Sequence, residues 1–94
     1  MIYEFLRKKI PRNIALKMRH NGDMLVVNSD ELEIFYLNNT GASFFEKCDA
    51  KRTIEEIEKL MLEEFDVDRS ILRKDLLSLV RDLQWRKLIV LEGE

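Results

Sequence analysis

The most informative segment of the sequence is Glu33-Ile34-Phe35-Tyr36-Leu37-Asn38-Asn39-Thr40. Its first five residues are rich in aromatic and β-branched side chains, which predicts a strand. The three residues that follow all favour the N-cap position of a helix, so a helix is expected over Ala42–Cys48. The chain therefore changes from strand to helix at this point.

Two further strands are expected before this junction. In Ile14–Arg19 the large apolar side chains alternate with small or charged ones, and this period of two predicts a half-buried strand. Asn21-Gly22 predicts a tight turn, because both residue types tolerate a positive φ, and Met24–Val27 then returns as the second strand. With residues 33–37 as the third strand, the first half of the chain is predicted to be an antiparallel meander.

The second half of the chain is predicted to be helical. Thr53-Ile54-Glu55-Glu56 matches a capping box, which places the start of a second helix at Ile54. A third and longest helix begins near Asp68 or Ser70 and runs to about Trp85, followed by a short β-prone segment at 88–91. One stripe of this third helix is apolar and is expected to face the core: Leu72, Leu76, Leu79, Val80 and Leu83.

This order of elements predicts an α+β fold. A three-stranded antiparallel sheet followed by three helices is typical of a winged helix-turn-helix-like arrangement. The length of 94 residues indicates a single domain over 1–94. Residues 1–11 are expected to form an N-terminal arm, because this apolar segment is too short to fold alone. The arm could cover a groove of its own domain, join a neighbour's sheet or stay mobile.

The composition excludes several classes of function. One cysteine, Cys48, and one histidine, His20, cannot form a disulfide framework or a Cys/His metal site. Cys48 is expected to be a buried packing residue, and His20 a solvated turn residue. No catalytic set and no phosphate-binding motif is found, so we expect neither enzyme activity nor a cofactor or metal. No apolar run is long enough to span a membrane, and the N-terminus does not resemble a secretory signal, so a cytoplasmic protein is expected.

A chain without a catalytic set is expected to bind a partner, and two modes suit this fold. A winged-helix regulator would bind DNA through its third helix. The net charge of −2 does not favour this mode, and Asp75 and Asp82 on that helix would repel phosphates. The second mode is β-augmentation, in which an extended peptide adds a strand to Glu33–Leu37 at the sheet edge. A third, weaker possibility is an adaptor that holds two enzymes together.

Several segments, taken in order, resemble the PqqD family, the small peptide-binding proteins of pyrroloquinoline quinone biosynthesis and their relatives. The resemblance covers roughly residues 12–91. Its elements are an L-N-x-T junction at Leu37–Thr40, a C-D-x-x-x-T-I-x-x-I pattern at Cys48–Ile57 and a D-L-x-x-L-x-x-x-L pattern at Asp75–Leu83. Their order and spacing together make the match specific.

The resemblance implies a domain that recognises precursor peptides. Such a domain binds the leader segment of a ribosomally made peptide as an added strand on its third strand, in a groove closed by its third helix. It delivers the leader to a modifying enzyme, typically a radical S-adenosylmethionine (SAM) enzyme. The expected partners are therefore a leader peptide and a radical SAM enzyme, with no nucleic acid and no membrane.

This sequence departs from the family pattern at two positions. Ala50 stands where the family often has a glycine after Asp49, and Lys87 stands where a glycine commonly follows the third helix. Lysine in the left-handed C′ position costs roughly 1 kcal/mol, so the helix is expected to end differently here. The departures also leave open whether the chain serves the quinone pathway or another peptide system.

The predicted groove combines the third strand with one flank of the third helix. Phe35 and Leu37 are expected to face the core, because Leu37 leads into the next helix. The helix flank with acidic residues is expected to form the groove wall and to favour a leader with basic residues. The same free edge is expected to allow a weak or strand-exchanged homodimer. The full predicted peptide-binding set is Glu33, Ile34, Phe35, Tyr36, Leu37, Ile71, Lys74, Asp75, Ser78 and Asp82.

Overall fold

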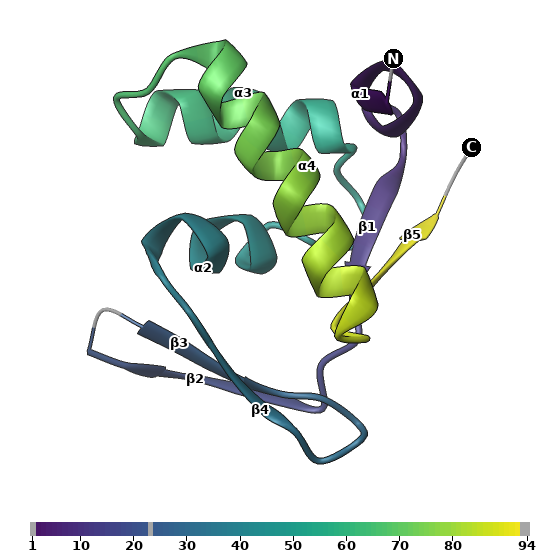
Figure 1. Ribbon diagram of the computed structural model, residues 1–94, viewed down its shortest axis with the longest axis vertical. Helices are drawn as coiled ribbons and strands as arrows, with labels where there is room; N and C mark the ends of the chain where they lie inside the picture. The colour runs from purple at the N-terminus through teal and green to yellow at the C-terminus, as the bar shows by residue number, and fades with distance from the viewer. Residues whose placement is uncertain (1, 23, 93–94) are drawn as a thin grey trace.

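The computed structural model describes residues 2–22 and 24–92, and Figure 1 shows how their elements are arranged. The elements confirm the predicted α+β fold, with a three-stranded antiparallel sheet followed by three helices, and they confirm the short β-prone segment expected at 88–91. They add a short N-terminal helix and one further strand, which pairs with that segment. In chain order they are α1 (Ile2–Leu6), β1 (Ile10–Asn13), β2 (Lys17–Asn21), β3 (Met24–Asn28), β4 (Ile34–Leu37), α2 (Asn39–Glu46), α3 (Ile54–Glu64), α4 (Arg69–Trp85) and β5 (Ile89–Glu92).

The larger sheet has the strand order β2-β3-β4, with antiparallel pairing throughout. The predicted hairpin between β2 and β3 is confirmed, but its turn lies one residue later than expected. Asn21 still pairs with Met24, so the connection consists of Gly22, with φ of +64°, and residue 23, which lies outside the described residues. A two-residue connection of this kind requires positive φ, which Gly22 adopts without strain.

The prediction that the first strand is half-buried is wrong. All five residues of β2 are exposed, and Leu16 just before it is exposed too. Strand β2 lies at the sheet edge, whereas α2 packs against β3 and β4. The predicted alternation covers Ile14–Arg19, but the strand itself runs from Lys17 to Asn21, and its single apolar residue, Met18, is exposed.

Three helices pack together above the sheet (Figure 1). Asn38 caps α2 by accepting a hydrogen bond from the Gly41 amide at 3.0 Å, and Thr53 and Glu56 form the predicted capping box of α3. On α4 the buried positions are the predicted apolar stripe, except that Leu79 is only partly buried. The helices and strands share one hydrophobic core, centred on the following residues: Leu25, Val27, Phe44, Phe45, Ile54, Ile57, Met61, Leu72, Leu76, Val80 and Leu83.

The N-terminal segment differs from the expected arm. Residues Ile2–Leu6 form α1, and β1 pairs antiparallel with β5, so the two ends of the described chain are joined in one ribbon. Tyr3 is buried, and its hydroxyl donates a hydrogen bond of 2.6 Å to Glu58 on α3. This segment packs on its own domain, on the side of α4 that carries Arg73, and becomes part of the core.

Both positions that depart from the family glycines adopt the left-handed conformation. Ala50 has φ of 66° and Lys87 has φ of 60°. After α4, the Lys87 amide donates to the Gln84 carbonyl and the Leu88 amide to the Leu83 carbonyl, which is a Schellman motif. The expectation that α4 ends differently is therefore wrong, because the usual C-cap forms with lysine in place of glycine.

Candidate functional site

Strand β4 offers backbone hydrogen-bonding groups at a free edge. It pairs with β3 on one side, and on its other side it pairs with no strand in the described part of the chain. The Ser29 amide donates to the Glu33 carbonyl at 2.9 Å, in the same register as the β3–β4 ladder, so these two residues form a hydrogen-bonded pair. Because such pairs alternate along an antiparallel ladder, Phe35 and Leu37 bond to β3. The amides and carbonyls of Ile34 and Tyr36 therefore point away from the sheet.

The side chains of β4 follow the predicted alternation. Leu37 is buried and Phe35 is partly buried against the core, which confirms both assignments, whereas Ile34 and Tyr36 are 55% and 61% exposed. Glu33 precedes the strand and is exposed. The free edge thus carries exposed apolar and aromatic side chains beside its outward backbone groups.

Helix α4 runs antiparallel beside this strand. Near the start of β4, the Arg86 guanidinium stacks on the Phe35 ring at 4.6 Å. Near its end, a Cβ placed on Gly41 would lie 3.6 Å from both Leu37 and Leu79. The C-terminal end of α4 therefore lies at the beginning of β4, and the middle of α4 lies where β4 passes into α2 (Figure 1).

A groove lies between the start of α2 and this side of α4. It measures about 410 Å³ and is lined by Asn38, Thr40, Gly41, Asp75, Ser78, Leu79 and Asp82. We call it the α2–α4 groove. Three of these residues, Asp75, Ser78 and Asp82, were predicted for the groove wall, and all three come from one flank of α4. Gly41 lies against Leu79, where a Cβ would make ordinary van der Waals contact, so the start of α2 and the middle of α4 are neighbours.

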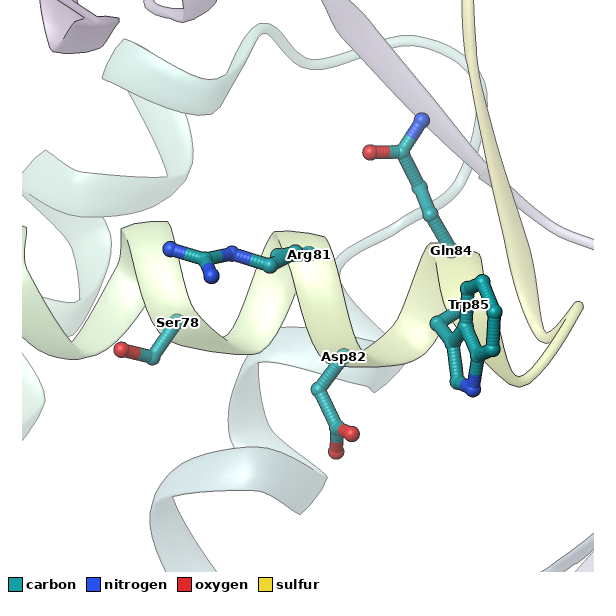
Figure 2. A pocket seen from close by; sticks show the side chains of 5 residues that line it. All are labelled: Ser78, Arg81, Asp82, Gln84 and Trp85. Carbon is teal, nitrogen blue, oxygen red and sulfur yellow. The ribbon is translucent and has the colours of Figure 1, made fainter.

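A second depression continues the groove along α4 toward its C-terminal end. It measures about 660 Å³ and is lined by Ser78, Arg81, Asp82, Gln84 and Trp85. Figure 2 shows Ser78, Asp82 and Trp85 projecting from one side of α4, while Gln84 projects away from them. The Trp85 side chain is 85% exposed. A large aromatic side chain is thus left open to solvent at the end of the groove.

Several of these groove residues are absent from the peptide-binding set predicted from the sequence. Trp85 was treated only as the end of the helix, although it follows Asp82 by three residues and Ser78 by seven, a spacing that places all three on one face. The sequence predicts Asn38 and Thr40 as helix-cap candidates and as part of the L-N-x-T junction, but not as groove residues. Of the predicted set, Ile71 and Lys74 are exposed near the start of α4 and line neither depression.

The opposite flank of α4 is committed to internal contacts. Arg73 donates to the buried Glu58 carboxylate at 2.6 Å, and its guanidinium lies 4.3 Å from the centre of the Tyr3 ring. Burial, followed by the hydrogen bond and charge of Glu58, raises the pKa of Tyr3 far above its usual range. This flank is therefore occupied by α1 and α3, and the acidic flank is the one that borders the groove.

The ionisable groups elsewhere do not form a metal cluster. Among residues 2–22 and 24–92, no three His, Cys, Asp or Glu side chains gather closely enough to hold an ion. Cys48 is buried, as predicted, and burial raises the pKa of its thiol from 9.0 to about 12, so it is protonated at neutral pH. His20 lies 2.9 Å from Glu46 and is exposed. No helix within the described ranges is long and apolar enough to cross a membrane.

Comparisons with known proteins agree with this geometry. The family model described as coenzyme PQQ synthesis protein D (PqqD) matches residues 23–89. No curated protein sequence matches the chain. A solved structure, described as TbiB1 in complex with the TbiA(beta) leader peptide, is similar to this chain with a TM-score of 0.70 and 26% identity. The similarity covers 83% of this chain and 90% of that one.

Proposed function

The chain belongs to the PqqD family, and from this membership we propose that it binds the leader segment of a ribosomally made precursor peptide. The leader adds as a strand to the free edge of β4. The observation that carries the proposal is that this edge, with the outward amides and carbonyls of Ile34 and Tyr36, lies beside a groove on α4. The similar TbiB1 structure, which holds a leader peptide, supports the same assignment.

Binding of this kind needs no catalytic group. Backbone hydrogen bonds to the edge strand supply affinity, and side-chain pockets supply specificity. We propose that the protein is a non-catalytic, single-domain peptide chaperone that presents the bound leader to a modifying enzyme. A radical SAM enzyme is proposed as that partner, because such enzymes are the typical partners of this family. The proposed contact residues are those predicted from the sequence, joined by Asn38, Thr40, Leu79 and Trp85.

The alternative function, a DNA-binding regulator, predicts a binding affinity that depends more steeply on salt than peptide binding does. A winged-helix regulator would use α4, whose groove side carries Asp75 and Asp82. Binding through Lys and Arg contacts to phosphates weakens steeply as salt increases. Strand addition with apolar contacts is expected to weaken only modestly between about 50 and about 300 mM salt, over which the Debye length falls from about 14 to about 6 Å. Titration with a random DNA duplex and with a peptide at both salt concentrations separates the two functions.

The test of strand addition uses proline at two edge positions. A phage library of random twelve-residue peptides is panned against the protein, and the recovered peptides are titrated by calorimetry. Tyr36→Pro removes an outward amide and is expected to weaken binding by about tenfold or more, because a bound strand then loses its donor. The β3–β4 ladder does not use that amide, so the variant is expected to stay folded.

The matched control is Met18→Pro on β2. Since Leu25 and Val27 bond to β4, alternation leaves the Met18 amide pointing outward at the opposite edge of the sheet. Met18→Pro is expected to keep full peptide affinity. Equal affinities of a folded Tyr36→Pro variant and the wild type would contradict strand addition at β4.

A further inference from the structure

Two side chains on the groove side of α4, those of Asp75 and Trp85, are available to contact a ligand. Asp82 already pairs with Arg86 at 3.0 Å, whereas no ion pair involves Asp75 among the residues that the structure describes. Trp85, the single tryptophan of the chain, is 85% exposed. The groove side of α4 therefore offers an unpaired carboxylate at one end and an open indole at the other (Figure 2 shows the Trp85 end).

The distance between these groups suits one spacing in an extended peptide. Asp75 and Trp85 are ten residues apart on α4, which at a rise of 1.5 Å per residue is about 15 Å. A strand rises about 3.4 Å per residue, and only every second side chain faces the same side. Two peptide side chains that face the same side must be an even number of residues apart. A separation of four residues spans about 14 Å, which is the even separation closest to the distance of about 15 Å between Asp75 and Trp85.

The direction of the peptide follows from the sheet. All pairs in the sheet are antiparallel, and antiparallel pairing is slightly the more stable kind. A peptide antiparallel to β4 runs in the same direction as α4, because α4 is itself antiparallel to β4. Its residue near Asp75 therefore comes first in sequence, and its residue near Trp85 comes later.

We propose that the protein selects leaders that carry a basic residue followed, four residues later, by an aromatic residue. The basic residue pairs with Asp75, and the aromatic residue packs on Trp85. This inference rests on the proposed function and adds the chemical class of leader that the groove accepts. Aromatic contacts of tryptophan are among the strongest in protein interfaces, and an opposite charge at Asp75 adds selectivity.

The test uses synthetic twelve-residue peptides in which Lys and Phe stand in a background of Ser and Thr. One peptide has Lys and Phe four residues apart, two others have spacings of three and five, and a fourth has the order reversed. Affinities are measured by calorimetry, and Trp85 emission reports contact at the indole. The peptide with Lys first and Phe four residues later is expected to bind about fivefold more tightly than the others and to shift the emission to shorter wavelengths.

Two variants test the contacts separately. Asp75→Asn is expected to weaken binding of the four-spaced peptide about threefold and to leave a Lys→Ala version of that peptide unchanged. Trp85→Ala is expected to weaken binding about tenfold or more. The matched controls are Asp66→Asn in the α3–α4 loop and Phe5→Ala on α1, which change exposed residues outside the groove and are expected to bind normally.

The outcomes distinguish this inference from the proposed function. Equal affinities at all spacings, or an Asp75→Asn effect that is the same with and without the peptide lysine, would overturn the inference. The inference would also be overturned if none of the four synthetic peptides bound while the panned peptides did. If Tyr36→Pro still weakens the panned peptides in these cases, the proposed function stands. Binding that survives Tyr36→Pro would instead overturn the proposed function.

Discussion

Tyr3 donates a hydrogen bond of 2.6 Å to Glu58, a carboxylate that is 1% exposed and also accepts from Arg73. A buried charge of this kind is tolerated only when its partners are in place. Tyr3→Phe keeps the ring and removes the donor. We expect it to lower the free energy of unfolding by about 2 kcal/mol in urea denaturation, as for hydrogen bonds to charged groups.

The control for this prediction is the same substitution at Tyr36. Its hydroxyl makes no side-chain hydrogen bond among the described residues, and its side chain is 61% exposed. Tyr36→Phe is expected to change stability by less than about 0.5 kcal/mol. Similar effects of the two substitutions would show that the Tyr3–Glu58 bond contributes little.

Because the Cys48 thiol is buried, we expect the free energy of unfolding to fall at alkaline pH. Burial raises the pKa of its thiol from 9.0 to about 12, so the folded protein holds this proton more tightly than the unfolded chain does. The stabilisation is complete below about pH 9 and is lost as pH rises from 9 toward 12. Between pH 9 and 10.5 we expect the free energy of unfolding to fall by roughly 1.5 kcal/mol more in the wild type than in Cys48→Ala. Parallel pH profiles for the two proteins would contradict this account of Cys48.

The C-cap of α4 offers a site where one substitution is expected to stabilise the protein. Lys87 adopts φ of 60° in the Schellman motif, a conformation that glycine adopts without steric cost. Lys87→Gly is expected to raise the free energy of unfolding by about 1 kcal/mol. The ion pair of 2.7 Å with Glu31, lost in this variant, is exposed and contributes little. Lys87→Ala, which loses the ion pair and keeps the left-handed strain, serves as the control and is expected to show no gain in thermal or urea denaturation.

The elements with local signals were predictable from the sequence, and those that depend on distant pairing were not. The capping box at Thr53, the apolar stripe of α4 and the aromatic-rich β4 each lie within a few residues. Strand β1 contains Pro11 and has only four residues, and its partner β5 lies almost at the other end of the chain. The β-prone residues 88–91 predict β5, but no local pattern shows that β5 pairs with β1. For the same reason the packing of α1 against Glu58 could not be predicted.

Deleting residues 1–10 tests whether the N-terminal elements belong to the core. The deletion removes buried Tyr3 and part of the β1–β5 ribbon, so we expect a loss of about 3 kcal/mol or more in urea denaturation. Phe5→Ala, at a position that is 68% exposed, is expected to have little effect. An unchanged unfolding midpoint after the deletion would mean that this segment behaves as the arm expected from the sequence.

At the scale of the whole molecule, the groove is formed by segments that are far apart in the chain. The sequence could predict that β4 would be an edge strand and that Asp75, Ser78 and Asp82 share one flank of α4. It could not show that Trp85 stays exposed or that the start of α2 lies against Leu79, because both depend on how α4 crosses the sheet. Whether the predicted residues contact a peptide stays a prediction.

Amide hydrogen exchange of β4, measured by NMR with and without a peptide from the panned library, shows whether the peptide adds to this strand. In the free protein the Phe35 and Leu37 amides bond to β3 and are expected to exchange slowly, whereas the Ile34 and Tyr36 amides point outward and are expected to exchange fast. When the peptide is bound, we expect the Ile34 and Tyr36 amides to exchange as slowly as those of Phe35 and Leu37. Fast exchange of both amides in the saturated complex would contradict the addition of the peptide to this strand.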